Sequence, residues 1–233
     1  MEFRCVHCGS GVKTLFVQYS PGNIRLMKCD NCKAVADEYI ECEITIVLID
    51  LILHKRKAYR HVLYNVLNRN TVDAEGILWK SIFIYLFTDA HRNLILINSK
   101  GHWGSSTGSF ASIWAGGMMM MEVLLGNFAF FGVLLLMKRL FMKSSSQVTS
   151  NKDIFLAILV SSYFKLFVVA MMVWEFPASV LFIIDIFVLS SNAVALTVLQ
   201  QETMTGGMGM CLSAHAAKVV ANHALEFLLV RVL

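Results

Sequence analysis

The amino-acid sequence predicts a membrane α-helical bundle of three to four transmembrane helices, preceded by a small N-terminal module that is rich in cysteine. Hydrophobic residues make up 57% of the 233 residues, charged residues only 15%, and the mean hydropathy is +0.62. Soluble chains are about 45–50% apolar and about 25% charged. The composition therefore excludes intrinsic disorder, a collagen-like chain and a water-soluble single domain.

Charge is distributed unevenly along the chain. The segment 1–70 contains ten basic and seven acidic side chains, whereas the much longer segment 71–233 contains only ten and nine. This shift divides the protein into a polar N-terminal module and a hydrophobic remainder. The formal net charge of +4 is small and scattered, and it indicates no partner by itself.

Four of the six cysteines form two closely spaced pairs, Cys5 with Cys8 and Cys29 with Cys32. Such pairs are typical of zinc sites, because four thiolates complete the tetrahedron that structural zinc prefers and leave no open position for chemistry. The alternative, disulfide bonding, requires an oxidising compartment. The chain opens without a cleavable signal peptide, so we expect this module in reducing cytosol. We therefore predict a structural zinc ion on these four cysteines.

The segment between the two cysteine pairs predicts a β-hairpin. Residues 12–19 and 24–28 flank the sequence Ser20-Pro21-Gly22-Asn23, in which proline and glycine occupy favoured turn positions. We therefore predict a zinc ribbon over residues 1–43. Residues 1–42 contain five basic and five acidic side chains, so the ribbon lacks a basic surface, and we expect no nucleic acid among its partners.

Residues 44–70 follow a helical pattern with one polar stripe on an otherwise apolar helix. The stripe consists of Asp50, His54, Lys57, His61 and Asn65. One interpretation is a solvated helix face that packs on the ribbon. Another is a membrane-surface helix whose basic residues meet anionic headgroups. A catalytic pair of Asp50 and His54 is the weakest interpretation, because no nucleophile stands beside the pair in the sequence.

Six short motifs within residues 1–68 point to a known family. They are Cys5-Val-His-Cys8-Gly9, Tyr19-Ser-Pro-Gly-Asn-Ile-Arg25-Leu, Cys29-x2-Cys32, Ala36-Asp37-Glu38-Tyr39-Ile40-Glu41, Ile49-Asp50-Leu-Ile-Leu-His54-Lys and Ala58-Tyr59-Arg60-His61-Val-Leu-Tyr64-Asn65. In order and in register they resemble the homology domain of the Arv family. The rest of the chain resembles that family only in being hydrophobic.

The resemblance implies a multi-pass membrane protein of the endoplasmic reticulum that mediates sterol homeostasis. It implies a role in sterol uptake, trafficking and distribution into membranes, with effects on sphingolipid metabolism and on glycosylphosphatidylinositol (GPI) precursors. The composition and spacing themselves do not indicate sterol binding. The expected partners are membrane lipids, an anionic lipid surface and, in a second interpretation, subunits of a membrane glycosyltransferase.

Three stretches are long enough to cross a bilayer, which needs about 20 mainly apolar residues. They cover residues 110–137, 154–174 and 178–199. Each contains one charged residue, and these are Glu122, Lys165 and Asp185. Charges inside a bilayer are costly and by default face the bundle interior, where they find a partner. We expect Lys165 to pair with Asp185 or Glu122, or one of the three to reach a headgroup. The three residues form either a structural salt bridge or a polar path for a lipid headgroup or ion.

A fourth stretch, residues 77–97, is ambiguous because it contains Lys80, Asp89 and Arg92 among its apolar residues. The positive-inside rule places the N-terminal module and the basic loop after residue 137 on the same side of the membrane, which requires an even number of crossings between them. We therefore favour four spans over three, with Asp89 and Arg92 neutralising each other at helical spacing.

The C-terminal region begins with the glycine-rich residues 205–209, which we expect to form a flexible joint. Residues 211–233 then place polar side chains on one face and apolar side chains largely elsewhere. This pattern predicts a C-terminal amphipathic helix on the membrane surface. A short tail span is the competing interpretation.

Three functions of different classes are compatible with these features. The leading one is a protein that distributes sterol and other lipids, with the ribbon as a docking platform. The second is an accessory subunit or precursor-delivery factor in GPI-anchor biosynthesis. The third is an integral-membrane lipid enzyme that uses Glu122, Lys165 and Asp185. The sequence contains no dinucleotide fingerprint, P-loop or elbow-type serine motif, so we expect a protein that is not an enzyme.

Overall fold

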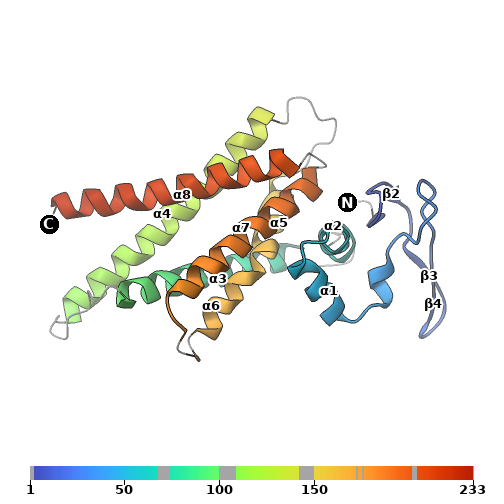
Figure 1. Ribbon diagram of the computed structural model, residues 1–233, viewed down its shortest axis with the longest axis horizontal. Coiled ribbons are helices and arrows are strands. Elements are labelled where there is room, and N and C mark those ends of the chain that lie inside the picture. The colour runs from blue at the N-terminus through green and yellow to red at the C-terminus, as the bar shows by residue number, and fades with distance from the viewer. Residues whose placement is uncertain are drawn as a thin grey trace.

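A computed structural model of the protein describes residues 3–67, 74–99, 109–141, 150–171, 173–174, 176–200 and 204–232. A small module with four short strands at the N-terminus lies beside a bundle of helices that the rest of the chain forms (Figure 1). The predicted fold class, a mainly helical bundle with a small β module that carries a cysteine cluster, is confirmed.

Two antiparallel hairpins build the N-terminal module. In the first, β1 (Phe3–Arg4) pairs with β2 (Gly11–Val12), and in the second, β3 (Phe16–Ser20) pairs with β4 (Asn23–Leu26). The turn of the second hairpin contains Gly22 with a φ of +83°, a left-handed conformation that glycine adopts without steric cost. The hairpin predicted between the two cysteine pairs is confirmed.

The segment after the hairpins is helical but interrupted. It consists of the 3₁₀ turn η1 (Glu38–Glu41), α1 (Ile44–Ile52), α2 (Arg56–Arg60) and the π-helical turn η2 (His61–Val66). The prediction of one continuous polar-striped helix over residues 44–70 is therefore wrong, and its last residues, 68–70, lie outside the described part of the chain.

The interruption between α1 and α2 lies at His54, whose φ is +56°. The His54 Nε2 atom lies 2.9 Å from the hydroxyl of Ser190, and the His54 ring stacks on Phe187 at a centroid distance of 6.2 Å. Both partners belong to α7, which is far along the chain. A tertiary contact thus overrides the local helical periodicity.

In the described residues the bundle contains five long helical segments, one of which is broken in its middle. The elements are α3 (Ala74–Ser99), α4 (Ser109–Phe141), α5 (Asn151–Ser161), the 3₁₀ turn η4 (Ser162–Lys165), α6 (Leu166–Ala170), α7 (Ser179–Gln200) and α8 (Met204–Val232).

Three helical stretches in the described part of the chain are long and apolar enough to cross a membrane: Gly116–Leu140, Asn151–Ala170 and Ser179–Gln200. They overlap the three spans predicted from the sequence at residues 110–137, 154–174 and 178–199. The ambiguous residues 77–97 fall within α3, which is helical throughout but is not one of the three. A fourth crossing thus stays a prediction.

The second span is not a regular α-helix, because it tightens into a 3₁₀ turn at Ser162–Lys165. The hydroxyls of Ser161 and Ser162 lie within hydrogen-bonding distance of the backbone oxygen of Ile158 and of Oδ1 of Asn192 in α7. Serine hydroxyls that bond back to the preceding turn bend helices. The bend sets the orientation of Lys165 at the end of the turn.

The prediction of a flexible joint at residues 205–209 followed by a surface helix is wrong. Helix α8 is continuous from Met204 and packs on α7 and along α4 (Figure 1). Its polar residue Lys218 bonds to residues of α3 and α4 inside the bundle. The polar face that the pattern assigned to a surface helix therefore points into the bundle.

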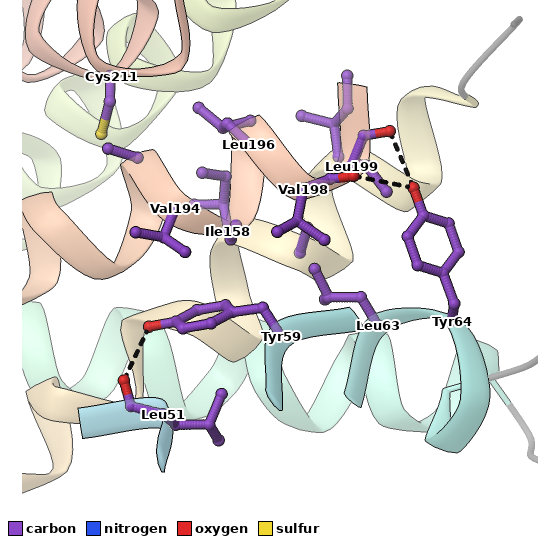
Figure 2. Packing of buried hydrophobic residues seen from close by; sticks show 14 of the residues in the cluster. Leu51, Tyr59, Leu63, Tyr64, Ile158, Val194, Leu196, Val198, Leu199 and Cys211 are labelled. Atoms are coloured by element: carbon purple, nitrogen blue, oxygen red, sulfur yellow. Dashed lines mark hydrogen bonds between the residues drawn. The ribbon is translucent and has the colours of Figure 1, made fainter. Parts of the chain in front are cut away.

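The N-terminal segment and the bundle share one hydrophobic core (Figure 2). Tyr59 and Leu63 pack with Ile158 of α5 and with apolar residues of α7. The hydroxyl of Tyr64 donates to the last backbone oxygens of α7, at 3.3 Å to Val198 and 3.0 Å to Leu199. The segment around α2 is therefore fixed against α7 rather than lying free on a surface.

We expect Gly207→Ala to weaken the contact between α7 and α8. A Cβ atom at Gly207 would lie 2.3 Å from Oγ1 of Thr197 and 3.0 Å from the backbone oxygen of Ala193. Overpacking of this kind costs about 1–3 kcal/mol, and each kcal/mol lowers the Tm of a chain of this size by about 2–4 °C.

The measurement is thermal unfolding in detergent, with Gly209→Ala as the matched control. A Cβ at Gly209 meets no atom within 4 Å, and alanine favours the helix, so its Tm should be unchanged or slightly raised. Equal melting temperatures for the two variants would contradict the close approach at Gly207.

Candidate metal centre and polar cavity of the bundle

The four cysteine thiols of the two pairs converge in the N-terminal module. All four Sγ atoms lie within 4.8 Å of one another, with 3.7 Å between Cys5 and Cys32 and 3.6 Å between Cys8 and Cys29. Zn–S bonds of about 2.3 Å in a regular tetrahedron place the sulfurs about 3.8 Å apart. The thiols therefore fit a tetrahedral metal ion, and among the described residues this is the one metal-ligating cluster found.

Each cysteine pair lies on a tight turn with a left-handed residue. Gly9 has a φ of +79° and Lys33 a φ of +61°. In the first turn the Gly9 N–H donates to the Cys5 oxygen, and in the second the Lys33 N–H donates to the Cys29 oxygen, both at 2.9 Å. The two half-sites therefore have the same backbone geometry, as their equal Cys-x2-Cys spacing predicts.

Ser10 is a polar neighbour of the thiols that the sequence reasoning missed. Its hydroxyl lies 2.9 Å from Sγ of Cys8 and 3.2 Å from Sγ of Cys29. Desolvation acts to raise the pKa of Cys8, but the hydrogen bonds from Ser10 and the neighbouring cysteines outweigh it and lower the pKa to about 6. The thiolate of Cys8, which is the form that binds metal, is thus favoured at neutral pH, whereas burial raises the pKa of Cys5 to about 12.

A fully buried carboxylate, Asp37, joins the ribbon to η2. Its Oδ2 accepts a hydrogen bond from Asn65 Nδ2 at 2.6 Å and lies 2.7 Å from Nδ1 of His61. Its Oδ1 accepts the backbone N–H of Tyr39 at 3.0 Å. The Asn65 amide also exchanges two hydrogen bonds with the backbone of Arg4 in β1, at 2.9 and 3.0 Å.

Two further residues of the polar stripe contact the η1 turn. Asp50 accepts hydrogen bonds from the Tyr39 hydroxyl and from Lys55 Nζ, both at 2.7 Å, and these two bonds, led by that from Lys55, lower the pKa of Asp50. Lys57 lies 3.2 Å from the carboxylate of Glu38.

The structure therefore divides the predicted stripe. Asp50, Lys57, His61 and Asn65 face the ribbon and η1, whereas His54 faces α7. The described contacts place Asp50 and His54 with different partners, so the two do not form a pair. Sequence periodicity grouped these residues but did not identify Asp37, which precedes the helical segment.

Arg60 fixes the first cysteine turn to α2. Its Nη1 donates to the backbone oxygens of Val6 at 2.9 Å and His7 at 2.6 Å. Its guanidinium also lies close to Gly9, because a Cβ atom added to Gly9 would be 3.6 Å from Nε of Arg60. The cysteine cluster is thus held against the helical segment by a charged side chain as well as by Asn65.

A second cluster lies inside the bundle and is centred on Asp89 of α3. Nζ of Lys165 lies 2.6 Å from one carboxylate oxygen, and Nζ of Lys218 lies 2.6 Å from the other. Asn127 of α4 donates to Asp89 at 2.9 Å and accepts from Lys218 at 2.9 Å. Lys165 also lies over the ring of Tyr85, 3.3 Å from its centroid, a cation–π contact.

A separate ion pair lies beside this cluster. Arg92 of α3 donates through Nε to Asp185 of α7 at 3.2 Å and through Nη2 to the other oxygen of the same carboxylate. Lys165 therefore pairs with Asp89 of α3 instead of the expected Asp185. Arg92 pairs with Asp185 of α7 instead of the expected Asp89. Glu122 lies on α4, next to Val123.

A cavity of about 280 Å³ connects the two clusters. Its lining includes both ion pairs, His215 and Lys218 of α8, and apolar residues of α7 and α8. Three of these apolar residues are largely exposed on the outside of the bundle: Phe182, Ile186 and Val219. The cavity is therefore lined by both charged and apolar side chains, and the apolar ones include the buried Val123 and Val188.

Comparison with known proteins links this architecture to a family. The model of the Arv1-like family matches residues 4–196. The chain belongs to this family. The match runs from β1 into α7, so it includes much of the bundle as well as the N-terminal module and the segment around α2.

Individual relatives cover most of the chain. Protein ARV 1 of Arabidopsis thaliana is 47% identical over 225 residues, which are 97% of this chain and 89% of the relative. Protein ARV 2 of Arabidopsis thaliana is 46% identical over 218 residues, 94% of this chain and 92% of the relative. Protein ARV1 of Homo sapiens is 30% identical over 206 residues, 84% of this chain and 72% of the relative. No solved structure matches.

Replacing Cys5 or Cys29 with serine should abolish zinc binding, because the site loses one of its four thiolate ligands. We expect about one zinc per chain in the unaltered protein, loss of the metal and an unfolded ribbon in either variant, and unchanged membrane insertion. Elemental analysis of the purified protein gives the stoichiometry. Cys42→Ser is the control, since Cys42 lies outside the cluster; zinc retained by Cys5→Ser would refute the assignment.

Replacing Asp37 with alanine should detach the ribbon from η2 while zinc stays bound. Leaving a buried hydrogen-bonding group without its partner costs about 1–3 kcal/mol, and here His61 and Asn65 both lose their contact with Asp37. Limited proteolysis between residues 37 and 60 should become faster, whereas the exposed Asp30→Ala control should behave as wild type. An unchanged cleavage rate in Asp37→Ala would show that Asp37 does not hold the ribbon.

Proposed function

We propose that this Arv1-like protein is a non-enzymatic membrane protein of the endoplasmic reticulum that binds membrane lipids and redistributes them, in support of sterol homeostasis. The observation that carries the proposal is the cavity between α3, α7 and α8, which is lined by charged side chains and by apolar side chains that reach the outside of the bundle. Membership of the family supports a general role in sterol and lipid homeostasis.

An amphipathic lipid fits such a cavity in one orientation. Its polar headgroup would lie among the charged residues, and its apolar body would stay in the bilayer beside Phe182, Ile186 and Val219. Isolated charges within a membrane are costly and by default mark substrate or ion pathways.

The N-terminal module would serve as a cytosolic docking platform with a structural zinc ion. The four cysteines would hold the zinc, which completes the fold of the ribbon and leaves no ligand position for chemistry. The apolar residues Ile44, Ile49 and Leu53 of the α1 region are more than half exposed, and Lys55 and Arg56 follow them. This combination suits contact with an anionic lipid surface.

The test is lipid movement between vesicles by the reconstituted, zinc-loaded full chain. We expect sterol and GPI-precursor transfer above protein-free controls, and a several-fold lower rate for Lys165→Met, because Asp89 loses one of its two cations. Lys152→Met is the matched control, since Lys152 is exposed and pairs with Glu75 away from the cavity.

The outcomes separate the candidate functions. Transfer that depends on Lys165 and not on Lys152 supports the proposal. No transfer by the unaltered protein overturns it, and stable co-purification with a membrane glycosyltransferase would then favour the accessory-subunit function in GPI-anchor biosynthesis. Conversion of the lipid into a new product would contradict the non-enzymatic role.

A further inference from the structure

We infer that the cavity between α3, α7 and α8 binds the phosphate group of an anionic phospholipid headgroup, with Arg92, Lys165 and Lys218 as the cationic residues around it. The inference rests on the proposed lipid-binding function and names the lipid class that this site takes. It is carried by three observations: the charge of the lining, its donors and the size of the cavity.

The lining residues carry more positive than negative charge. Arg92, Lys165 and Lys218 supply three cations, whereas Asp89 and Asp185 supply two carboxylates. An excess positive charge in a medium of low dielectric constant is costly unless a counter-charge lies close by. A phosphodiester has a single negative charge and balances the lining, while a sterol hydroxyl has none.

The cations also retain hydrogen-bonding capacity. An ammonium group has three donors and a guanidinium five. In the described residues Lys165 donates to Asp89, Lys218 donates to Asp89 and Asn127, and Arg92 donates twice to Asp185. Donors from three elements, α3, η4 and α8, therefore surround one cavity. Such convergence suits a group with several acceptor oxygens.

His215 lines the cavity from α8, one turn before Lys218. Its Nε2 atom is buried and has no hydrogen-bond partner among the described residues, so an oxygen of a headgroup in the cavity reaches this atom only after the ring turns.

The dimensions select a headgroup rather than a whole lipid. A water molecule takes about 30 Å³ in the liquid, so 280 Å³ is room for a phosphate and a few neighbouring atoms. The acyl chains would remain outside, along Phe182, Ile186 and Val219, which are 68%, 49% and 54% exposed.

The test compares two lipids that share their acyl chains. Phosphatidylglycerol and diacylglycerol are added separately to the zinc-loaded full chain in mild detergent, and bound molecules are counted by native mass spectrometry. We expect phosphatidylglycerol to bind about tenfold or more tightly than diacylglycerol, as charge-assisted hydrogen bonds would give. Inorganic phosphate is added as competitor, and displacement of the lipid at millimolar phosphate would overturn the lipid as the source of the group.

Two variants test the site itself. Lys218→Met should lower phosphatidylglycerol binding about tenfold without unfolding the bundle, because Asp89 keeps Lys165 and Asn127. Val219→Trp fills the rim without removing a charge and should lower binding as well. Lys152→Met should bind as wild type. Unchanged binding by both Lys218→Met and Val219→Trp, at wild-type Tm and zinc content, overturns the assignment.

The inference and the proposed function fail separately. If vesicle transfer of sterol occurs but phosphatidylglycerol binds no better than diacylglycerol, the phosphate site is wrong and the lipid-transfer function stands. If phosphatidylglycerol binds selectively and Lys218→Met abolishes this, but no lipid moves between vesicles, the site stands and the transfer function is wrong.

Discussion

A carboxylate buried inside the bundle needs positive charges or hydrogen-bond donors close to it. Asp89 of α3 receives them from three other elements, η4, α4 and α8. Moving such an ion from water into an apolar interior has an idealised cost of order 20 kcal/mol. Asp89 on α3 therefore fixes the positions of Lys165 on η4, Asn127 on α4 and Lys218 on α8. Lys165 at the end of the 3₁₀ turn and Lys218 on the inward polar face of α8 both neutralise this one charge.

Asp37 plays the corresponding part in the N-terminal module. It is fully buried and gathers His61, Asn65 and the backbone of Tyr39. Between the two carboxylates lies an apolar core to which both halves of the chain contribute. The architecture thus consists of two buried polar centres, each of which joins segments distant in sequence, separated by hydrophobic packing.

The features that the sequence predicted are those encoded within short segments. Cysteine spacing identified the four converging thiols, and runs of about 20 apolar residues identified three helices that are long enough to cross a membrane. The break at His54 and the inward position of Lys218 depend on partners far along the chain, so periodicity alone assigned both residues to the wrong surroundings. Asp89 and Arg92 illustrate the same limit, since their helical spacing favoured a local pair but each has a partner on another helix.

Helix α7 contacts both the segment that carries the ribbon and the cavity of the bundle. Near its C-terminal end it accepts the hydroxyl of Tyr64 at Val198 and Leu199, and nearer its start it presents Asp185 to the cavity, about 20 Å away along the helix axis. A rigid helix that touches two sites is a path for energetic coupling between them. Suppose that a molecule binds the ribbon and thereby shifts α7. Thermodynamic reciprocity then requires that it change the affinity of the cavity for its ligand by some factor, and that the ligand of the cavity change the affinity of the ribbon for this molecule by the same factor.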